Sequence, residues 1–201
     1  MSSIVDRSYF RDLAASDPED VCRRAQCRYD AESKLYSMLV WGEDYIVNPF
    51  SLTIKRLGAR PAEIDDLLAL FIIYYLLKCK DLEVDNDWIS EKDMPGGATF
   101  FRGPHAIPTG LISHKYSGIV QEFNQRCQRL NGIPLEMADG AFSFSITPRI
   151  PVAVLFWDGD EDFPAEAKIL FDRTITEHLT LDIVYSLTVV ICRRVTGSHQ
   201  S

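Results

Sequence analysis

The sequence predicts an α+β fold: a single domain in which a mainly antiparallel sheet packs against a buried central helix and a C-terminal helix. An apolar run of eleven residues, Leu67–Leu77, has the spacing of a core helix. The continuous apolar segment Val152–Trp157 is typical of an interior strand. The length of 201 residues suits one domain, so we take residues 1–201 as a single unit.

The N-terminal half begins with a helical region, residues 5–27, which is interrupted near its middle. Asp17 is a suitable helix cap and Pro18 suits a first helical turn, so a second helix is expected to begin there. Residues 34–57 then alternate between apolar and polar side chains and contain turn residues. This pattern predicts two or three short antiparallel strands.

A long helix is predicted from Pro61 to about Lys80. Its apolar residues cover nearly its whole circumference, which is typical of a helix buried on several sides. The acidic stretch 81–93 and a sharp turn follow. Residues 102–113 are rich in glycine and proline and predict a long irregular segment, a kind of segment that often has a function.

Helix and strand patterns both continue in the C-terminal half. A helix is expected over residues 117–130, ended by Asn131-Gly132. Residues 142–146 alternate as a half-buried strand, and residues 167–171 form a short extended or helical piece. The final helix is expected to start at the Thr180 cap and to end near Val195.

The composition excludes several classes of function. The net charge of −8 disfavours nucleic-acid binding, because an acidic chain repels phosphate backbones. The longest apolar run is well below the roughly 20 residues that a membrane span needs, and no signal peptide is expected. The five cysteines are scattered without a CxxC pair, so we expect reduced thiols and a cytoplasmic location.

The most unusual segment is the acidic loop after the apolar strand. Asp158, Asp160 and Asp162 alternate as the first ligands of a calcium loop do, but Phe163 and Ile169 occupy the positions where an EF-hand needs glycine and glutamate. A cation site of another geometry is one alternative. The other is a solvated acidic turn, neutralised by the flanking residues Arg149 and Arg173.

A second unusual segment combines a tryptophan with a turn of two glycines, which lets a backbone approach a ligand closely. Together with the acidic loop it gives the candidate ligand-binding residues: Trp88, Gly96, Gly97, Trp157, Asp158, Asp160 and Asp162. The sequence contains no HExxH, GxSxG, P-loop or GxGxxG pattern. No catalytic residue is therefore assigned, and whether the chain is an enzyme stays open.

Several of these segments resemble one family as a set. They are Trp88-Ile89-Ser90, Met94-Pro95-Gly96-Gly97-Ala98, Pro148-Arg149-Ile150-Pro151, the block from Phe156 to Ala165, and Ile169-Leu170-Phe171-Asp172. From about Asp17 to Val195 the chain resembles the DUF3786 family, a family of anaerobic bacteria and archaea without an assigned function. Some relatives resemble fusions with a cysteine-rich iron–sulfur segment, which this chain lacks. The resemblance implies a link to anaerobic redox or one-carbon metabolism.

Three interpretations of function follow. The first is a cytoplasmic accessory or ligand- or cofactor-binding domain, whose partner is a redox or one-carbon-pathway protein and whose cofactor is unspecified. The second is a metal-assisted hydrolase that uses the loop Asp158–Asp162. The third is a homo-oligomeric interaction protein. None of them involves nucleic acid or a membrane.

Overall fold

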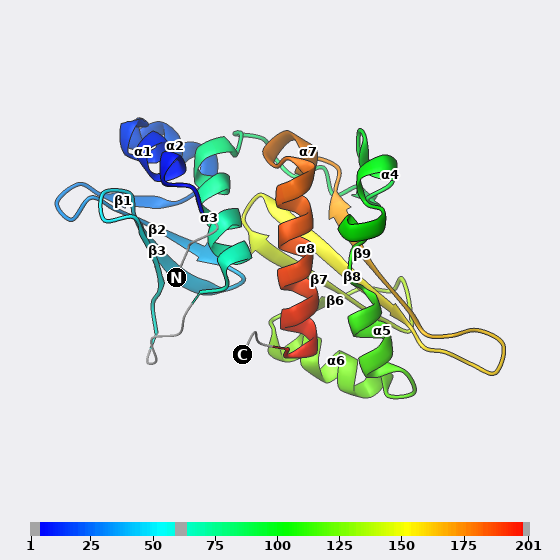
Figure 1. Cartoon of the computed structure of the whole chain (residues 1–201). Coiled ribbons are helices and arrows are strands. Elements are labelled where there is room, and N and C mark those ends of the chain that lie inside the picture. Colours follow the sequence, from blue (N-terminus) through cyan, green and yellow to red (C-terminus); the bar gives the residue numbers. More distant parts are fainter. Residues whose placement is uncertain (1–4, 59–63, 199–201) are drawn as a thin grey trace.

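Two antiparallel sheets and the helices between them make up the computed structural model, which describes residues 5–58 and 64–198 (Figure 1). The first sheet has the order β1-β2-β3-β4, and the second has the order β5-β9-β8-β7-β6. The strands of the first sheet are β1 (Arg28–Asp30), β2 (Leu35–Val40), β3 (Glu43–Asn48) and β4 (Thr53–Arg56). Those of the second are β5 (Trp88–Ile89), β6 (Ile133–Pro134), β7 (Gly140–Thr147), β8 (Ile150–Trp157) and β9 (Glu166–Asp172). An α+β fold is thus confirmed, with two sheets where one was expected.

The N-terminal helices follow the predicted pattern of caps. They are α1 (Arg7–Ala15) and α2 (Pro18–Ala25). Asp17 caps α2, because its carboxylate accepts a hydrogen bond of 3.2 Å from the backbone N–H of Glu19. Pro18 lies in the first turn, where backbone N–H groups have no partner within the helix, so the missing N–H of proline costs no hydrogen bond.

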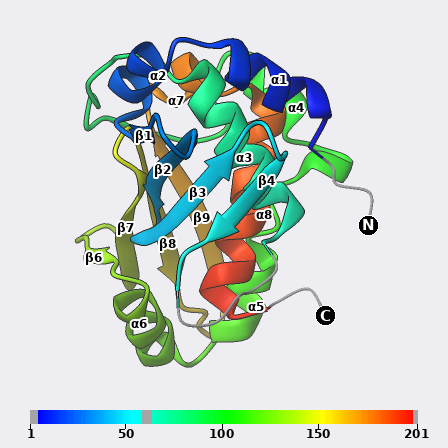
Figure 2. The ribbon, with the colours of Figure 1, turned by 90° about the vertical axis from the view of Figure 1, so that its left-hand side faces the viewer.

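The central helix is α3 (Asp66–Lys78), which is shorter than the predicted helix from Pro61 to Lys80. Pro61 lies outside the described residues. The helix begins one residue after Asp65, whose carboxylate accepts the N–H of Leu67 at 2.8 Å. Figure 2 shows α3 between the four-stranded sheet and the C-terminal helix α8 (Leu181–Thr196). Because α3 is enclosed by these elements, it is apolar around its circumference.

The segment predicted as irregular is mostly helical. Within residues 102–113 it contains a 3₁₀ turn (Gly103–His105) and the first part of α5 (Gly110–Tyr116). The short helix α4 (Gly97–Phe100) precedes this segment, and α6 (Val120–Arg129) follows it. The single helix expected over residues 117–130 therefore starts later, at Val120. The break falls at Gly118, which has a φ of +75°, a conformation that glycine adopts without strain.

Strand β8 occupies the middle of the five-stranded sheet, as its apolar run predicts. Val152, Val154 and Phe156 face the main core, while Ala153 and Leu155 belong to a second apolar cluster on the opposite face. Helices α5 and α6 lie against the core side of this sheet (Figure 1), and the short helix α7 (Ile175–His178) connects β9 to α8. No described helix is long and apolar enough to cross a membrane.

Removing the aromatic ring of Phe71 should destabilise the whole domain. Phe71 lies in α3 with none of its surface exposed, so Phe71→Ala would leave a cavity in the main core. We expect a loss of about 3–5 kcal/mol in the free energy of unfolding, measured by chemical denaturation. Tyr74→Ala on the same helix, at a half-buried position, is the control and should cost less; equal losses would contradict the placement of Phe71.

Candidate functional site

Two carboxylates of the acidic loop between β8 and β9, those of Asp158 and Asp160, accept hydrogen bonds from backbone N–H groups. One carboxylate oxygen of Asp158 accepts the N–H of Gly118 at 2.7 Å and that of Gly159 at 3.0 Å. One oxygen of Asp160 accepts the N–H groups of Asp162 and Phe163 at 2.9 and 2.8 Å. These bonds fold the loop back on itself and fasten it to the turn between α5 and α6.

Arg149 and Arg173 do not neutralise this loop, contrary to the expectation from their positions in the sequence. Arg149 pairs with Asp81, and Arg173 pairs with Asp87 at 2.5 Å. Both arginines lie at the far ends of strands β8 and β9, so the length of the strands separates them from the loop. Asp172 is likewise not the ion-pair partner of Arg173, because its carboxylate accepts the backbone N–H groups of Asp85, Asn86 and Thr174.

The candidate ligand-binding residues fall into two groups at opposite ends of strand β9. Trp157 pairs with Glu166 at one end, next to Asp158, Asp160 and Asp162, whereas Trp88 pairs with Asp172 at the other end. Both tryptophan rings pack on the outer apolar cluster of the sheet. Whether either group binds a ligand stays a prediction.

Gly96 and Gly97 belong to the Trp88 group, and both are needed by the local backbone. Gly96 has a φ of +77° and lies beside Leu181 at the start of α8. A Cβ atom on Gly97 would lie 1.9 Å from the carbonyl oxygen of Glu91. This double-glycine turn is therefore explained by close packing of the chain on itself.

A polar hollow of about 530 Å³ adjoins the acidic loop. Its lining includes Asp160, the exposed ring of Phe163, and His114 on α5. The part of the chain that the structure describes contains no group of three or more His, Cys, Asp and Glu side chains arranged to hold a metal ion. The described residues near Asp158–Asp162 therefore do not provide the set of metal ligands that the hydrolase interpretation needs.

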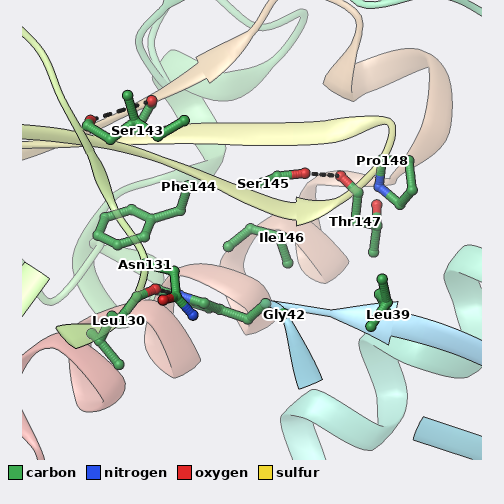
Figure 3. A pocket seen from close by; sticks show the side chains of 12 residues that line it. Leu39, Gly42, Leu130, Asn131, Ser143, Phe144, Ser145, Ile146, Thr147 and Pro148 are labelled. Carbon is green, nitrogen blue, oxygen red and sulfur yellow. Dashed lines mark hydrogen bonds between the residues drawn. The ribbon is translucent and has the colours of Figure 1, made fainter. Parts of the chain in front are cut away.

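A more enclosed pocket lies where the two sheets meet, and we call it the junction pocket (Figure 3). Its volume is about 270 Å³. Strand β2 and the turn between β2 and β3 contribute Leu39, Trp41 and Gly42, and the segment after α6 contributes Leu130, Asn131 and Ile133. Strand β7 and its end contribute Ser143, Phe144, Ser145, Ile146, Thr147 and Pro148.

Trp41 fixes the floor of the junction pocket. Its backbone N–H donates to the carbonyl of Ile146 at 2.7 Å, and its indole Nε1–H donates to the carbonyl of Leu130 at 3.1 Å. Its ring lies against the ring of Phe144, with 5.1 Å between the centroids. These contacts join β2 to β7 and to the end of α6. The guanidinium of Arg194 covers the Trp41 ring, 5.1 Å from its centroid.

The rim and walls of the junction pocket are apolar and uncharged. Leu39 and Ile133 keep 53% and 66% of their surface exposed on two sides of the opening. The hydroxyl of Ser145 donates to the carbonyl of Thr147 at 3.1 Å, so its oxygen can still accept a hydrogen bond (Figure 3). Among the described residues that line the pocket, none carries a charge.

Sequence reasoning did not identify this pocket, because its parts are far apart in the chain. The segments around Trp41, Asn131 and Phe144 were each assigned to a local element, and no local pattern links them. The one available signal was Leu39, an apolar residue that is exposed near the end of β2. A single exposed leucine is common on protein surfaces and does not by itself indicate a site.

A buried polar pair lies apart from both hollows, at the end of α3. His178 is only 2% exposed, and its Nδ1 accepts the backbone N–H of Lys80 at 3.2 Å. The thiol of Cys79 lies 3.6 Å from the same nitrogen. Since Nδ1 accepts, the ring proton is on Nε2, which has no hydrogen-bond partner among the described residues. Burial lowers the pKa of His178, with a smaller contribution from the nearby Arg149.

These observations define a single-domain α+β protein with an uncharged pocket between its two sheets. The chain belongs to the family described as Domain of unknown function (DUF3786), whose model matches residues 17–194. No curated protein and no solved structure matches the chain.

Asp158 should contribute more than Asp162 to the free energy of unfolding. Asp158→Ala removes the acceptor of the Gly118 N–H and should cost about 1 kcal/mol in unfolding free energy. Asp162→Ala, at an exposed position in the same loop, is the matched control and should cost clearly less. Both values come from urea denaturation.

Thermal unfolding of the wild-type protein tests the hydrolase interpretation. Since the described side chains near Asp158–Asp162 form no group of three metal ligands, we expect the same melting temperature in calcium, magnesium or manganese as in chelator. A metal-dependent rise in the wild type that is lost in Asp160→Asn would contradict this expectation and favour a cation site.

His178 should make the domain less stable as the pH falls. The unfolded chain takes up a proton near the ordinary value of 6.5, whereas the folded chain does so only at a lower pH. The stability contribution is therefore complete above 6.5 and is lost as the pH falls from there toward the folded pKa. His178→Asn keeps an acceptor for Lys80 and should flatten this slope in urea denaturation; the exposed His114→Asn control should follow the wild type.

Proposed function

We propose that this chain is a non-catalytic accessory domain that binds a small, uncharged and largely apolar molecule in the junction pocket. The observation that carries the proposal is the half-open, mainly apolar hollow of about 270 Å³, lined by the rings of Trp41 and Phe144. Ligand sites are typically concave and mainly apolar, with a few polar groups that orient the ligand. The volume is near the lower end of such sites, which favours a small molecule.

The pocket lining supports binding rather than catalysis. Its walls hold hydroxyl, amide and hydrocarbon groups, and none of the described lining side chains titrates near neutral pH. A general acid or base therefore has no candidate on these walls. A charged ligand would lose its hydration without gaining a counter-charge, so the pocket favours neutral compounds.

The cellular location and the partner of this domain stay predictions. A cytoplasmic location is supported by five free thiols, which suit a reducing compartment. A partner from anaerobic redox or one-carbon metabolism rests on the family resemblance. A binding domain of this kind would act beside an enzyme and hold a neutral compound for it.

Methyl NMR with a defined probe tests the proposed site. Benzyl alcohol has an aromatic body and one hydroxyl, and benzoate has the same ring with a charge. We expect benzyl alcohol to shift the Ile133 and Ile146 methyl signals saturably, because both side chains line the pocket, and to leave Ile119 unchanged. Benzoate should bind at least several times more weakly.

Two matched variants locate the binding. Leu39 and Leu57 are equally exposed, at 53% and 52%, but only Leu39 lines the pocket. Leu39→Ser should weaken binding about fivefold, equivalent to about 1 kcal/mol of lost apolar contact, while Leu57→Ser should leave it unchanged. Equal effects of the two changes, or no saturable shift in the wild type, would overturn the proposed function.

A further inference from the structure

The end of helix α2 brings two cysteine side chains together. Gln26 follows the helix in the left-handed conformation, with a φ of 50°. The backbone N–H of Gln26 and that of Cys27 both donate to the carbonyl of Cys22, the latter at 3.2 Å. In such a helix ending, the N–H of the residue after the left-handed position donates to the carbonyl of the residue five positions earlier, and the side chains of these two residues lie next to each other. Here those two residues are Cys27 and Cys22.

The two sulfur atoms are 3.7 Å apart, which is contact distance for two thiols. Both side chains are half-buried, so one of them can be reached from solvent, whereas Cys79, Cys127 and Cys192 are buried. A disulfide needs an S–S bond of about 2.05 Å and Cα atoms within roughly 4.4–6.8 Å of each other. The backbone hydrogen bond from Cys27 to Cys22 holds the two backbones together, so we expect the bond to close with little movement of the chain.

We propose that Cys22 and Cys27 form a redox-active pair that closes into a disulfide by exchange with a low-molecular-weight disulfide. The inference is independent of the junction pocket, since neither cysteine lines it. It adds a modification site to a chain whose cysteines are otherwise scattered through the sequence.

The exchange takes place in two steps. The Cys22 thiolate attacks one sulfur of the small disulfide, whose S–S bond breaks, and the released thiolate takes up a proton. The Cys27 thiolate then attacks the Cys22 sulfur of the mixed disulfide and releases the second small thiol. Two cysteine thiols are oxidised, and one small disulfide is reduced to two thiols.

The surroundings of the two thiols decide which of them attacks first. Burial raises the pKa of both thiols, and Cys27 is the more deeply buried. Cys22 therefore ionises more readily and is the attacking group. Once Cys22 carries the mixed disulfide, the neighbouring Cys27 thiol is held at a high effective concentration, which favours ring closure over a second exchange with solution.

The test uses the folded wild-type protein in buffers of reduced and oxidised glutathione over a range of ratios. After an acid quench and denaturation, free thiols are alkylated and the intact mass is measured. We expect a species that lacks two alkyl groups and carries no glutathione, and we expect the reduced form to return at reducing ratios. Trypsin cleaves after Arg23 and Arg24, so a Cys22–Cys27 bridge holds together two peptides that otherwise separate.

Single variants identify the order of the steps. Cys27→Ser should accumulate one glutathione on Cys22, because the second attack is lost. Cys22→Ser should take up glutathione more slowly, since the remaining thiol is the more buried. Circular dichroism of both variants checks that α2 is retained, and the wild-type mass measurement does not depend on either variant folding.

Three results would overturn the proposal. One is a wild-type protein that keeps all its alkylated thiols at the most oxidising ratio. Another is stable glutathione on Cys22 without ring closure. The third is a bridge that forms only in urea, or that joins other cysteines, because the pairing would then not come from the folded end of α2.

Discussion

The buried guanidinium of Arg149 is the interaction on which the arrangement of the two sheets depends. Arg149 is 4% exposed and lies at the turn between β7 and β8. Its Nε–H donates to the carbonyl of Arg24 at 2.8 Å, and its other nitrogens donate to the carbonyl of Leu82 and to the carboxylate of Asp81. A charge this deeply buried is costly unless every donor has a partner, so the three segments must assemble around it together.

This requirement links segments that are far apart in the sequence. Arg24 lies in the last turn of α2, and Asp81 and Leu82 follow α3, so the Arg149 side chain links both helices to the turn of the second sheet. Neighbouring bonds strengthen the connection: Arg24 donates to the carbonyl of Cys79, and the hydroxyl of Tyr75 donates to the carbonyl of Ala25. The first sheet starts at Arg28, directly after this connection, so its position relative to the second sheet follows from it. The junction pocket lies between the same two sheets, and its lining includes Thr147 and Pro148 beside Arg149.

The sequence predicted those features that are local and left undetected those that are not. The cap at Asp17 and the interior strand β8 follow from patterns within a few residues, and the structure has them. Helix α8 also begins directly after Thr180 as expected, although the Thr180 side chain makes no capping hydrogen bond. The segment 102–113 was misjudged because glycine and proline there separate short helices rather than prevent them. The pair Cys22 and Cys27 was missed for a related reason, since the helix ends at Gln26 and not at the glycine that usually signals this turn.

The acidic segments show most clearly why charge patterns in a sequence are ambiguous. Both the stretch 81–93 and the loop at Asp158–Asp162 contain crowded carboxylates, and each is satisfied differently. The first supplies counter-charges to Arg149 and Arg173, whereas Asp158 and Asp160 of the second accept backbone N–H groups from their own turn and from Gly118. A cation is therefore not required to explain either segment. The junction pocket differs from both segments, because its described lining carries no charge although the chain has a net charge of −8. For the ligand binding that we propose there, the cost of removing a charge from water would disfavour charged compounds and would not apply to neutral ones.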